Sequence, residues 1–138
     1  MNLKKILLFT AMIFLLSSTN NAQPYKIGDN LNGGIVFDVS INGMSGLVVD
    51  TKDMFDVMTW FDAVEACKSR GEGWYLPNRD EIKKLYPELK MVGRFAKGNY
   101  WCSSDKTASV AWFMNFNNGT QGSNNKAIKL NVRAIWAF

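Results

Sequence analysis

The sequence contains no histidine and only two cysteines, Cys67 and Cys102, among its 138 residues. Histidine is the usual proton donor and acceptor at neutral pH, and no nucleophile motif or glycine-rich phosphate loop takes its place. We therefore expect no enzymatic activity and assign no catalytic residue. A structural zinc ion needs about four nitrogen or sulfur ligands, which this chain lacks. The two thiols could form a disulfide in an oxidising compartment, or each could be a buried apolar side chain.

A hydrophobic segment long enough to span a membrane is also missing. The apolar run Ile6–Leu16 is shorter than the roughly 20 residues that a spanning helix needs. It follows Lys4 and Lys5 and precedes a polar stretch that ends at Ala22, which is the order of a secretory signal peptide. We predict a signal peptide over residues 1–22 and no permanent membrane span after its cleavage. The protein is then exported to the periplasm, the outer-membrane surface or the extracellular space.

No cluster of basic residues accompanies the positive net charge. The chain has 16 Lys and Arg and 12 Asp and Glu, and loss of Lys4 and Lys5 leaves 14 minus 12, or +2. The basic residues are scattered along the chain, which argues against nucleic acid as a partner. Residues 23–138 contain no repeat or linker and have the length of a single domain.

Hydrophobic periodicity predicts a hairpin and then two helices. The hairpin consists of strands at Gly34–Ser40 and Gly46–Asp50 with a turn between them. The residues expected on one face of the first strand are Ile35, Phe37 and Val39. Thr59 is the predicted N-cap of the first helix, which ends at Gly71. Its expected buried face consists of Trp60, Ala63, Val64 and Cys67.

The second predicted helix begins with a capping box formed by Asn78 and Glu81, and Pro87 limits it. The rest of the domain is predicted to be β-structure, with strands at Tyr100–Ser104, Val110–Phe116 and Lys129–Phe138. In the last strand, the residues expected to share a face are Val132, Ala134, Trp136 and Phe138. These patterns predict an α+β fold, with an antiparallel sheet, paired terminal strands and two flanking helices.

Seven short motifs occur in order along nearly the whole predicted domain. They are Tyr25–Asp29 with Gly33–Phe37, Gly46–Val49, Trp60 with Ala63 and Cys67, Gly73–Ile82, Tyr100–Ser104, Ala111–Gln121 and Val132–Ile135. Together they resemble the bacterial DUF1566 domains. These are C-type-lectin-like modules found in a collagen-like adhesin and in many exported proteins of Bacteroidetes.

The resemblance implies a C-type-lectin-like fold whose chain ends meet in a sheet. It implies core positions, and no binding role, for Trp74, Leu76, Pro77 and Trp101. Relatives often carry a cysteine at the position of Ala134 that could pair with the counterpart of Cys67, so we expect Cys67 to be unpaired here. The Glu-Pro-Asn, Gln-Pro-Asp and Trp-Asn-Asp motifs that hold Ca²⁺ in C-type lectins are absent. We therefore expect calcium-independent recognition, with no cofactor and no metal-binding residues.

One polar stretch, Asn115–Asn131, is rich in amides and hydroxyls, which can bind sugar hydroxyls or protein backbone. The candidate ligand-binding residues in it are Asn117, Asn118, Thr120, Gln121, Asn124 and Asn125. The same residue types are also typical of a plain hairpin loop. The scattered carboxylates are interpreted as surface charge; they are Asp53, Asp56, Asp62 and Asp105.

Two functions are compatible with this sequence. The first is an adhesin-like binding module that recognises a glycan or a surface protein at the cell envelope. The second is a structural or assembly subunit of an envelope or surface complex. Exposed aromatic side chains beside the polar stretch would favour the first, and a contiguous apolar patch of several hundred Å² would favour the second.

Overall fold

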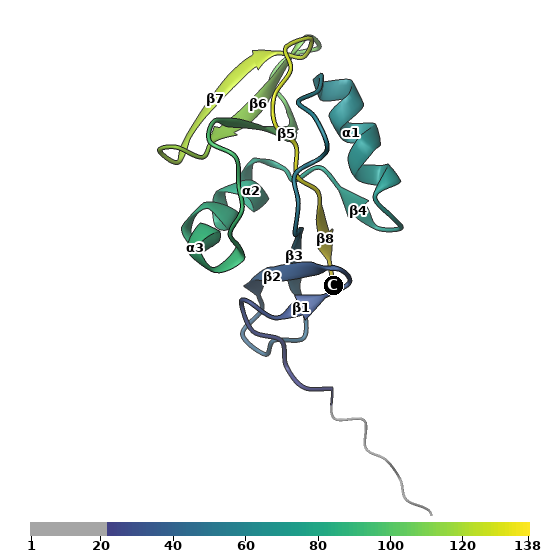
Figure 1. The fold of residues 1–138 in the computed structure, drawn as a ribbon, viewed down its shortest axis with the longest axis vertical. Helices are drawn as coiled ribbons and strands as arrows, with labels where there is room; N and C mark the ends of the chain where they lie inside the picture. The colour runs from purple at the N-terminus through teal and green to yellow at the C-terminus, as the bar shows by residue number, and fades with distance from the viewer. Residues whose placement is uncertain (1–21) are drawn as a thin grey trace, which may run out of the picture.

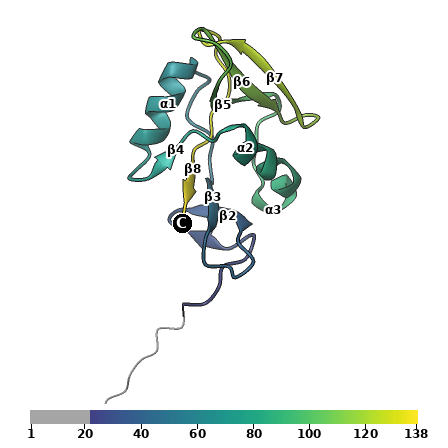
Figure 2. The same ribbon diagram turned by 180° about the vertical axis from the view of Figure 1, so that it is seen from behind.

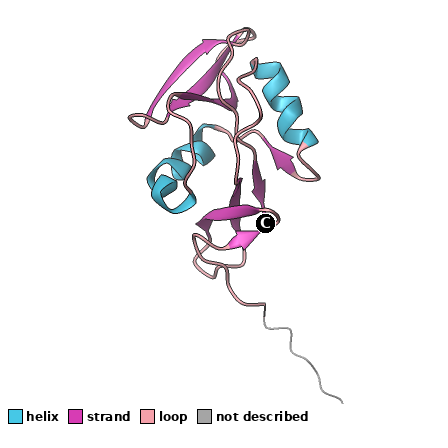
Figure 3. Cartoon of the chain, in the orientation of Figure 1, coloured by secondary structure: helices cyan, strands magenta, loops and turns pink. Residues whose placement is uncertain are grey.

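A computed structural model describes residues 22–138, in which two antiparallel sheets are combined with short helices (Figures 1 and 3). The predicted signal peptide, apart from Ala22, lies outside the described residues. The strands are β1 Asn30–Leu31, β2 Gly34–Val39, β3 Gly46–Asp50, β4 Trp74–Tyr75, β5 Asn99–Asp105, β6 Val110–Asn115, β7 Thr120–Asn125 and β8 Ile135–Ala137. The helices are α1 Trp60–Ser69, α2 Arg79–Leu85 and α3 Leu89–Val92, with a 3₁₀ turn at Tyr86–Glu88. Within residues 22–138, no helix has the length and apolar character needed to cross a bilayer.

The first sheet is covered by helices on both sides. Its strand order is β1-β2-β3-β8-β4, and α1 lies on one side of β3 and β8 with α2 and α3 on the other (Figures 1 and 2). Val48 packs in the core cluster that contains the buried residues of α1, whereas Val49 packs in the cluster that contains those of α2. Both valines are fully buried. The centre of this sheet therefore has no solvent-exposed face.

The shared face predicted for the last strand is confirmed, because Val132, Ala134, Trp136 and Phe138 pack in one core cluster. The face predicted for the first strand is interrupted, since Ile35 and Phe37 pack in one cluster and Val39 in the other. Val36 and Phe37 are consecutive and both buried, and the pairing of β2 with β3 is irregular between Val36 and Asp38. Residues 132–135 are likewise all buried. Alternation of buried and exposed residues is expected only where one face of a strand meets water, which is not the case for these segments.

The predicted pairing between strands from the two ends of the domain is found for β3, the second strand of the N-terminal hairpin. β8 lies between β3 and β4 and is antiparallel to both, so the C-terminal strand is an inner strand of the sheet. β8 is also shorter than the predicted strand Lys129–Phe138. The preceding residues instead make single bridges, Leu130 to Met58 and Asn131 to Tyr100. These bridges link the segment before β8 to the residues before α1 and to β5.

Both predicted helix starts are confirmed. The Thr59 side chain accepts a hydrogen bond from the Asp62 backbone N–H, and Asn78 and Glu81 form the full capping box. The predicted stop at Pro87 is only partial, because the chain continues through the 3₁₀ turn into α3. Proline is tolerated within the first turn of a helical segment, where its missing N–H would have no partner, and Pro87 is the second residue of the 3₁₀ turn.

The second sheet has the order β5-β6-β7 and contains the polar stretch. Residues 120–125 form β7 and pair along their whole length with β6. The loop interpretation of these residues is therefore wrong, although Asn117–Gly119 does form the turn, with Gly119 at a φ of 76°. A polar strand is stable here because β6, which supplies the buried residues, provides its ladder.

Cys67 and Cys102 are both buried and not linked by a disulfide. Burial raises the pKa of the Cys67 thiol to about 12, with a smaller contribution from the Asp50 charge. Burial raises the pKa of Cys102 to about 12 as well.

We expect neither thiol to react with an alkylating reagent in the folded protein at neutral pH, because the reactive thiolate is suppressed. After denaturation without a reducing agent, mass spectrometry of the alkylated protein should detect two modified thiols. A reduced sample serves as the control and should give the same number. A denatured monomer with no modified thiol would contradict this expectation.

Candidate functional site

The six predicted binding residues do not form one surface. Asn117 and Asn118 lie in the turn after β6, and the other four lie on β7. Successive side chains of a strand point to opposite faces, so Thr120 and Asn124 share one face while Gln121 and Asn125 share the other. A single ligand could contact both groups only around the outer edge of β7.

Gln121 is held by structure rather than available to a ligand. Its amide oxygen accepts hydrogen bonds from the Arg79 Nε and Nη2 atoms at 3.2 and 3.0 Å, and its amide nitrogen donates to the Arg79 carbonyl at 2.9 Å. The same guanidinium lies 3.5 Å from the centre of the Trp112 ring. Gln121 therefore fastens β7 to the start of α2.

The side-chain amides of Asn118, Asn124 and Asn125 have local partners. The Asn118 oxygen accepts from the backbone N–H and the hydroxyl of Thr120, and the Asn125 oxygen accepts from the Ala127 backbone N–H. Asn117, Asn118, Thr120 and Asn125 are exposed, whereas Asn124 is half-buried. Within the described residues, the outer edge of β7 has no partner strand, and it carries the exposed side chains of Thr120 and Asn125.

Aromatic exposure near this edge is limited. Trp112, Phe113 and Trp136 are all half-buried, and the Phe113 ring lies over Gly122 of β7. Phe61 at the start of α1 is 60% exposed. Its ring centre is 5.5 Å from the buried Lys126 ammonium, immediately after β7. Through its contact with Lys126, the exposed Phe61 of α1 therefore lies near the end of β7.

The four residues interpreted as core are buried: Trp74, Leu76, Pro77 and Trp101. Trp101 donates from its indole nitrogen to the Met58 carbonyl at 3.0 Å. These four side chains support the fold as core residues.

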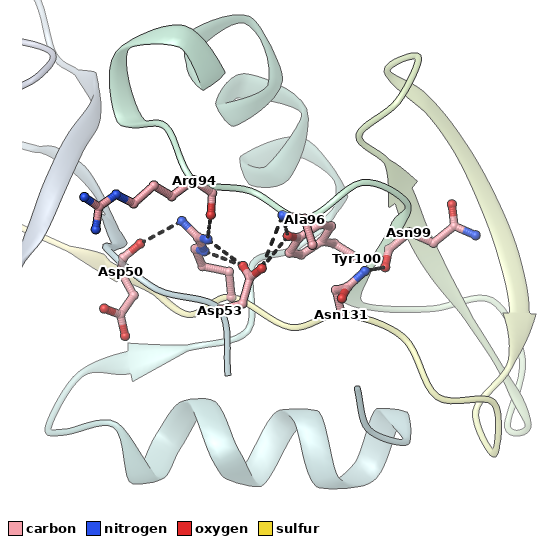
Figure 4. Close-up of polar contacts among 8 residues, drawn as sticks. Asp50, Asp53, Arg94, Ala96, Asn99, Tyr100 and Asn131 are labelled. Carbon is pink, nitrogen blue, oxygen red and sulfur yellow. Dashed lines mark hydrogen bonds and ion pairs between the residues drawn. The ribbon is translucent and has the colours of Figure 1, made fainter. Parts of the chain in front are cut away.

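Asp53, interpreted from the sequence as surface charge, is instead the centre of a polar network (Figure 4). Its carboxylate accepts from Arg133 Nε at 2.6 Å and from the Tyr100 hydroxyl at 2.7 Å. Arg133 is 3% exposed, and its guanidinium carbon lies 3.8 Å from the centre of the Phe95 ring. Asp53 thus supplies the counter-charge that a buried arginine requires.

The network ties together segments that are remote in sequence. Arg133 also donates to the backbone carbonyls of Asp50 and Arg94, and the Arg94 guanidinium itself points away from the network (Figure 4). The pKa of the Tyr100 hydroxyl is raised, mainly by burial and secondly by the hydrogen bond to Asp53. The hydroxyl therefore stays protonated and remains a hydrogen-bond donor. The network joins β3, β5 and the segment before β8, and its role is structural.

The other carboxylates differ in their surroundings. Asp105 forms an ion pair with the buried Lys126, whereas Asp56 and Asp62 are exposed as predicted. Across the described part of the chain, no three His, Cys, Asp or Glu side chains gather as ligands for a metal ion. The structure therefore offers no carboxylate cluster to which a cation could be assigned.

The arrangement of elements is similar to that of a solved structure, botrocetin, a C-type-lectin-like protein. The similarity has a TM-score of 0.57 at 12% sequence identity and covers 80% of this chain and 100% of botrocetin. At this identity the likeness concerns the fold alone, and it supports the α+β, lectin-like architecture. The comparison with curated proteins finds no match.

The family comparison corrects the resemblance inferred from the short motifs. Residues 51–135 match the family described as "Domain of unknown function (DUF8780)", and the chain is not matched to DUF1566. Most of the motifs consist of turn glycines and core aromatics, which unrelated families with a lectin-like fold can share for the same packing reasons. The match extends over more than half of the sequence, and the chain belongs to the DUF8780 family.

Proposed function

We propose that this protein is a non-enzymatic binding module, exported to the cell envelope, that recognises a glycan or a surface protein without calcium. Recognition would involve the outer edge of β7 and the turn before it. The carrying observation is that this strand ends the second sheet and bears exposed amide and hydroxyl groups. The likeness in fold to botrocetin supports a binding module only in the general sense of a shared architecture.

The edge of β7 has two properties that suit recognition. Its outer backbone N–H and C=O groups are open to an added strand, as in β-strand addition. In the described chain, residues 121–124 have no backbone-to-backbone hydrogen bonds beyond the ladder with β6. Its side chains are also polar, whereas the edge strands that lead to aggregation are flat and hydrophobic.

A second candidate function, an assembly subunit, is favoured by exposed apolar side chains around the start of α1. Val57, Phe61 and Ile128 are 41%, 60% and 44% exposed. Their segments are held together by the Met58 to Leu130 bridge and by the hydrogen bond from the Trp60 N–H to the Lys126 carbonyl. Such side chains are typical of a protein interface when they are contiguous.

Replacing Asn117 and Thr120 with alanine tests the proposed edge. Both residues are exposed, so the free energy of unfolding should fall by less than about 1 kcal/mol. Binding to a glycan array or to surface protein extracts should weaken by roughly tenfold. A chelator should leave the binding of the parent protein unchanged.

The matched control is Asn30→Ala, which removes an exposed amide from β1 on the other sheet. This variant should bind as the parent does. Unchanged binding by the Asn117→Ala, Thr120→Ala double variant would contradict the assignment to β7. Binding that is lost on Phe61→Ser while the double variant still binds would favour the assembly function.

A further inference from the structure

A hollow on the first sheet is separate from β7. It has a volume of about 580 Å³ and lies between the segment that joins α1 to β4, the turn before β2 and strand β8. Its volume is in the range of small-molecule sites. The side chains that border the hollow include those of Asn32, Arg70, Glu72, Trp74 and Trp136.

The two tryptophans lie directly opposite each other in the pairing of β4 with β8. Their side chains therefore lie on the same face of the sheet and both border the hollow. Trp74 is nearly buried, whereas Trp136 is half-buried. Within residues 22–138 neither indole N–H donates a hydrogen bond, so both remain available to a ligand that enters the hollow.

Gly73 sets the position of the Trp136 ring. Its φ is 78°, and a Cβ atom at this position would lie 2.8 Å from the Trp136 indole nitrogen. A side chain here would both strain the backbone and displace the indole. The glycine thus allows the Trp136 indole to pack closely against the backbone of residue 73 at the border of the hollow.

The charges around the hollow favour a neutral ligand over an anion. The Arg70 Nε atom donates to the Asp50 carboxylate at 2.6 Å, and its guanidinium carbon lies 4.5 Å from the centre of the Trp74 ring. Its positive charge is therefore already balanced. The Glu72 carboxylate is exposed at the rim and would repel an anion while accepting hydrogen bonds from hydroxyl groups.

We propose that this hollow binds a neutral saccharide unit, with the Trp136 ring as its apolar contact and Glu72, Arg70 and Asn32 as partners of its hydroxyl groups. A saccharide combines an apolar C–H surface with many hydroxyls, and this set of side chains matches both. No residue of the hollow belongs to β7. The saccharide site and the proposed edge can therefore be tested independently.

Titration of the full chain by NMR, observing the five tryptophan indole N–H signals, tests this proposal. The probes are methyl glycosides of neutral hexoses and N-acetylhexosamines, with inorganic phosphate as the anionic probe. We expect at least one glycoside to shift the Trp74 and Trp136 signals, and phosphate to shift neither. Trp136→Phe serves to assign its signal.

Glu72→Gln should weaken the binding of that glycoside by roughly tenfold. Glu65→Gln, which alters another exposed carboxylate, on α1, should bind as the parent does. Because Glu72 has no recorded partner in the described chain, its replacement leaves the fold intact, and retained binding would overturn the proposal. Shifts caused by phosphate, shifts of Trp112 in place of Trp136, or no shift with any glycoside would overturn it as well.

Discussion

Replacing Asp53 with alanine is expected to lower the free energy of unfolding by about 3 kcal/mol. The change leaves Arg133, which is 3% exposed, without its counter-charge, and it removes the acceptor of the Tyr100 hydroxyl. Breaking a buried ion pair costs about 3 to 5 kcal/mol. The lower end applies because the Asp53 side chain is 23% exposed, so that water can partly solvate the remaining charge.

Chemical denaturation followed by fluorescence or circular dichroism measures this loss. Asp56→Ala, an exposed carboxylate three residues along the chain, is the matched control and should change stability by less than about 0.5 kcal/mol. The double variant Asp53→Ala, Arg133→Met should recover part of the loss, because no unpaired charge is then buried. If the losses of stability in the two single variants, Asp53→Ala and Arg133→Met, simply add up in the double variant, the two residues are not coupled.

Deletion of Trp136–Phe138 should have the largest effect on stability. Trp136 and Phe138 are both half-buried, so their own burial contributes less than the roughly 2 to 3 kcal/mol of a fully buried side chain. The larger loss comes from the sheet, because β8 lies between β3 and β4. Its removal breaks two ladders and exposes Val48 and Trp74 to water.

The combined loss should be about 5 kcal/mol, which is comparable to the whole stability of a marginal domain. We therefore expect the truncated protein to be unfolded, as judged by circular dichroism, or to be degraded in cells. Deletion of Phe138 alone is the graded control. It removes the contact with Tyr25 at 5.1 Å between ring centres and the paired backbone bonds with Gly46, and it keeps the two ladders. If the longer truncation melts at the same temperature as the parent, β8 is not required for the stability of the first sheet.

The local features of the fold were predictable from the sequence. Thr59 and Asn78 identify two helix starts because a cap depends only on residues within one turn of itself. The hairpin of β2 and β3 and the turn at Asn117–Gly119 depend likewise on residues close in the chain. The core positions of Trp74 and Trp101 followed from the resemblance in motifs, although the family to which that resemblance pointed was wrong.

The features that concern function depended on contacts between remote residues. Asp53 and Arg133 are separated by 80 positions, and no local pattern distinguishes Asp53 from the exposed Asp56. The hydrogen bond between Arg79 and Gln121, which are 42 positions apart, likewise could not be predicted from the sequence. The hollow exists only because β4 and β8 bring Trp74 and Trp136 into register.

The sequence by itself determined the caps, the turns and the alternation of strands and helices, since these arise from interactions within a few residues. The tertiary structure alone decided that β8 lies inside the first sheet, that both faces of that sheet are buried, and that the polar stretch is an edge strand. The order of the strands and the coverage of each sheet face are set by the packing of apolar surfaces from distant segments. The residue pattern of one segment does not reveal which distant segment packs against it.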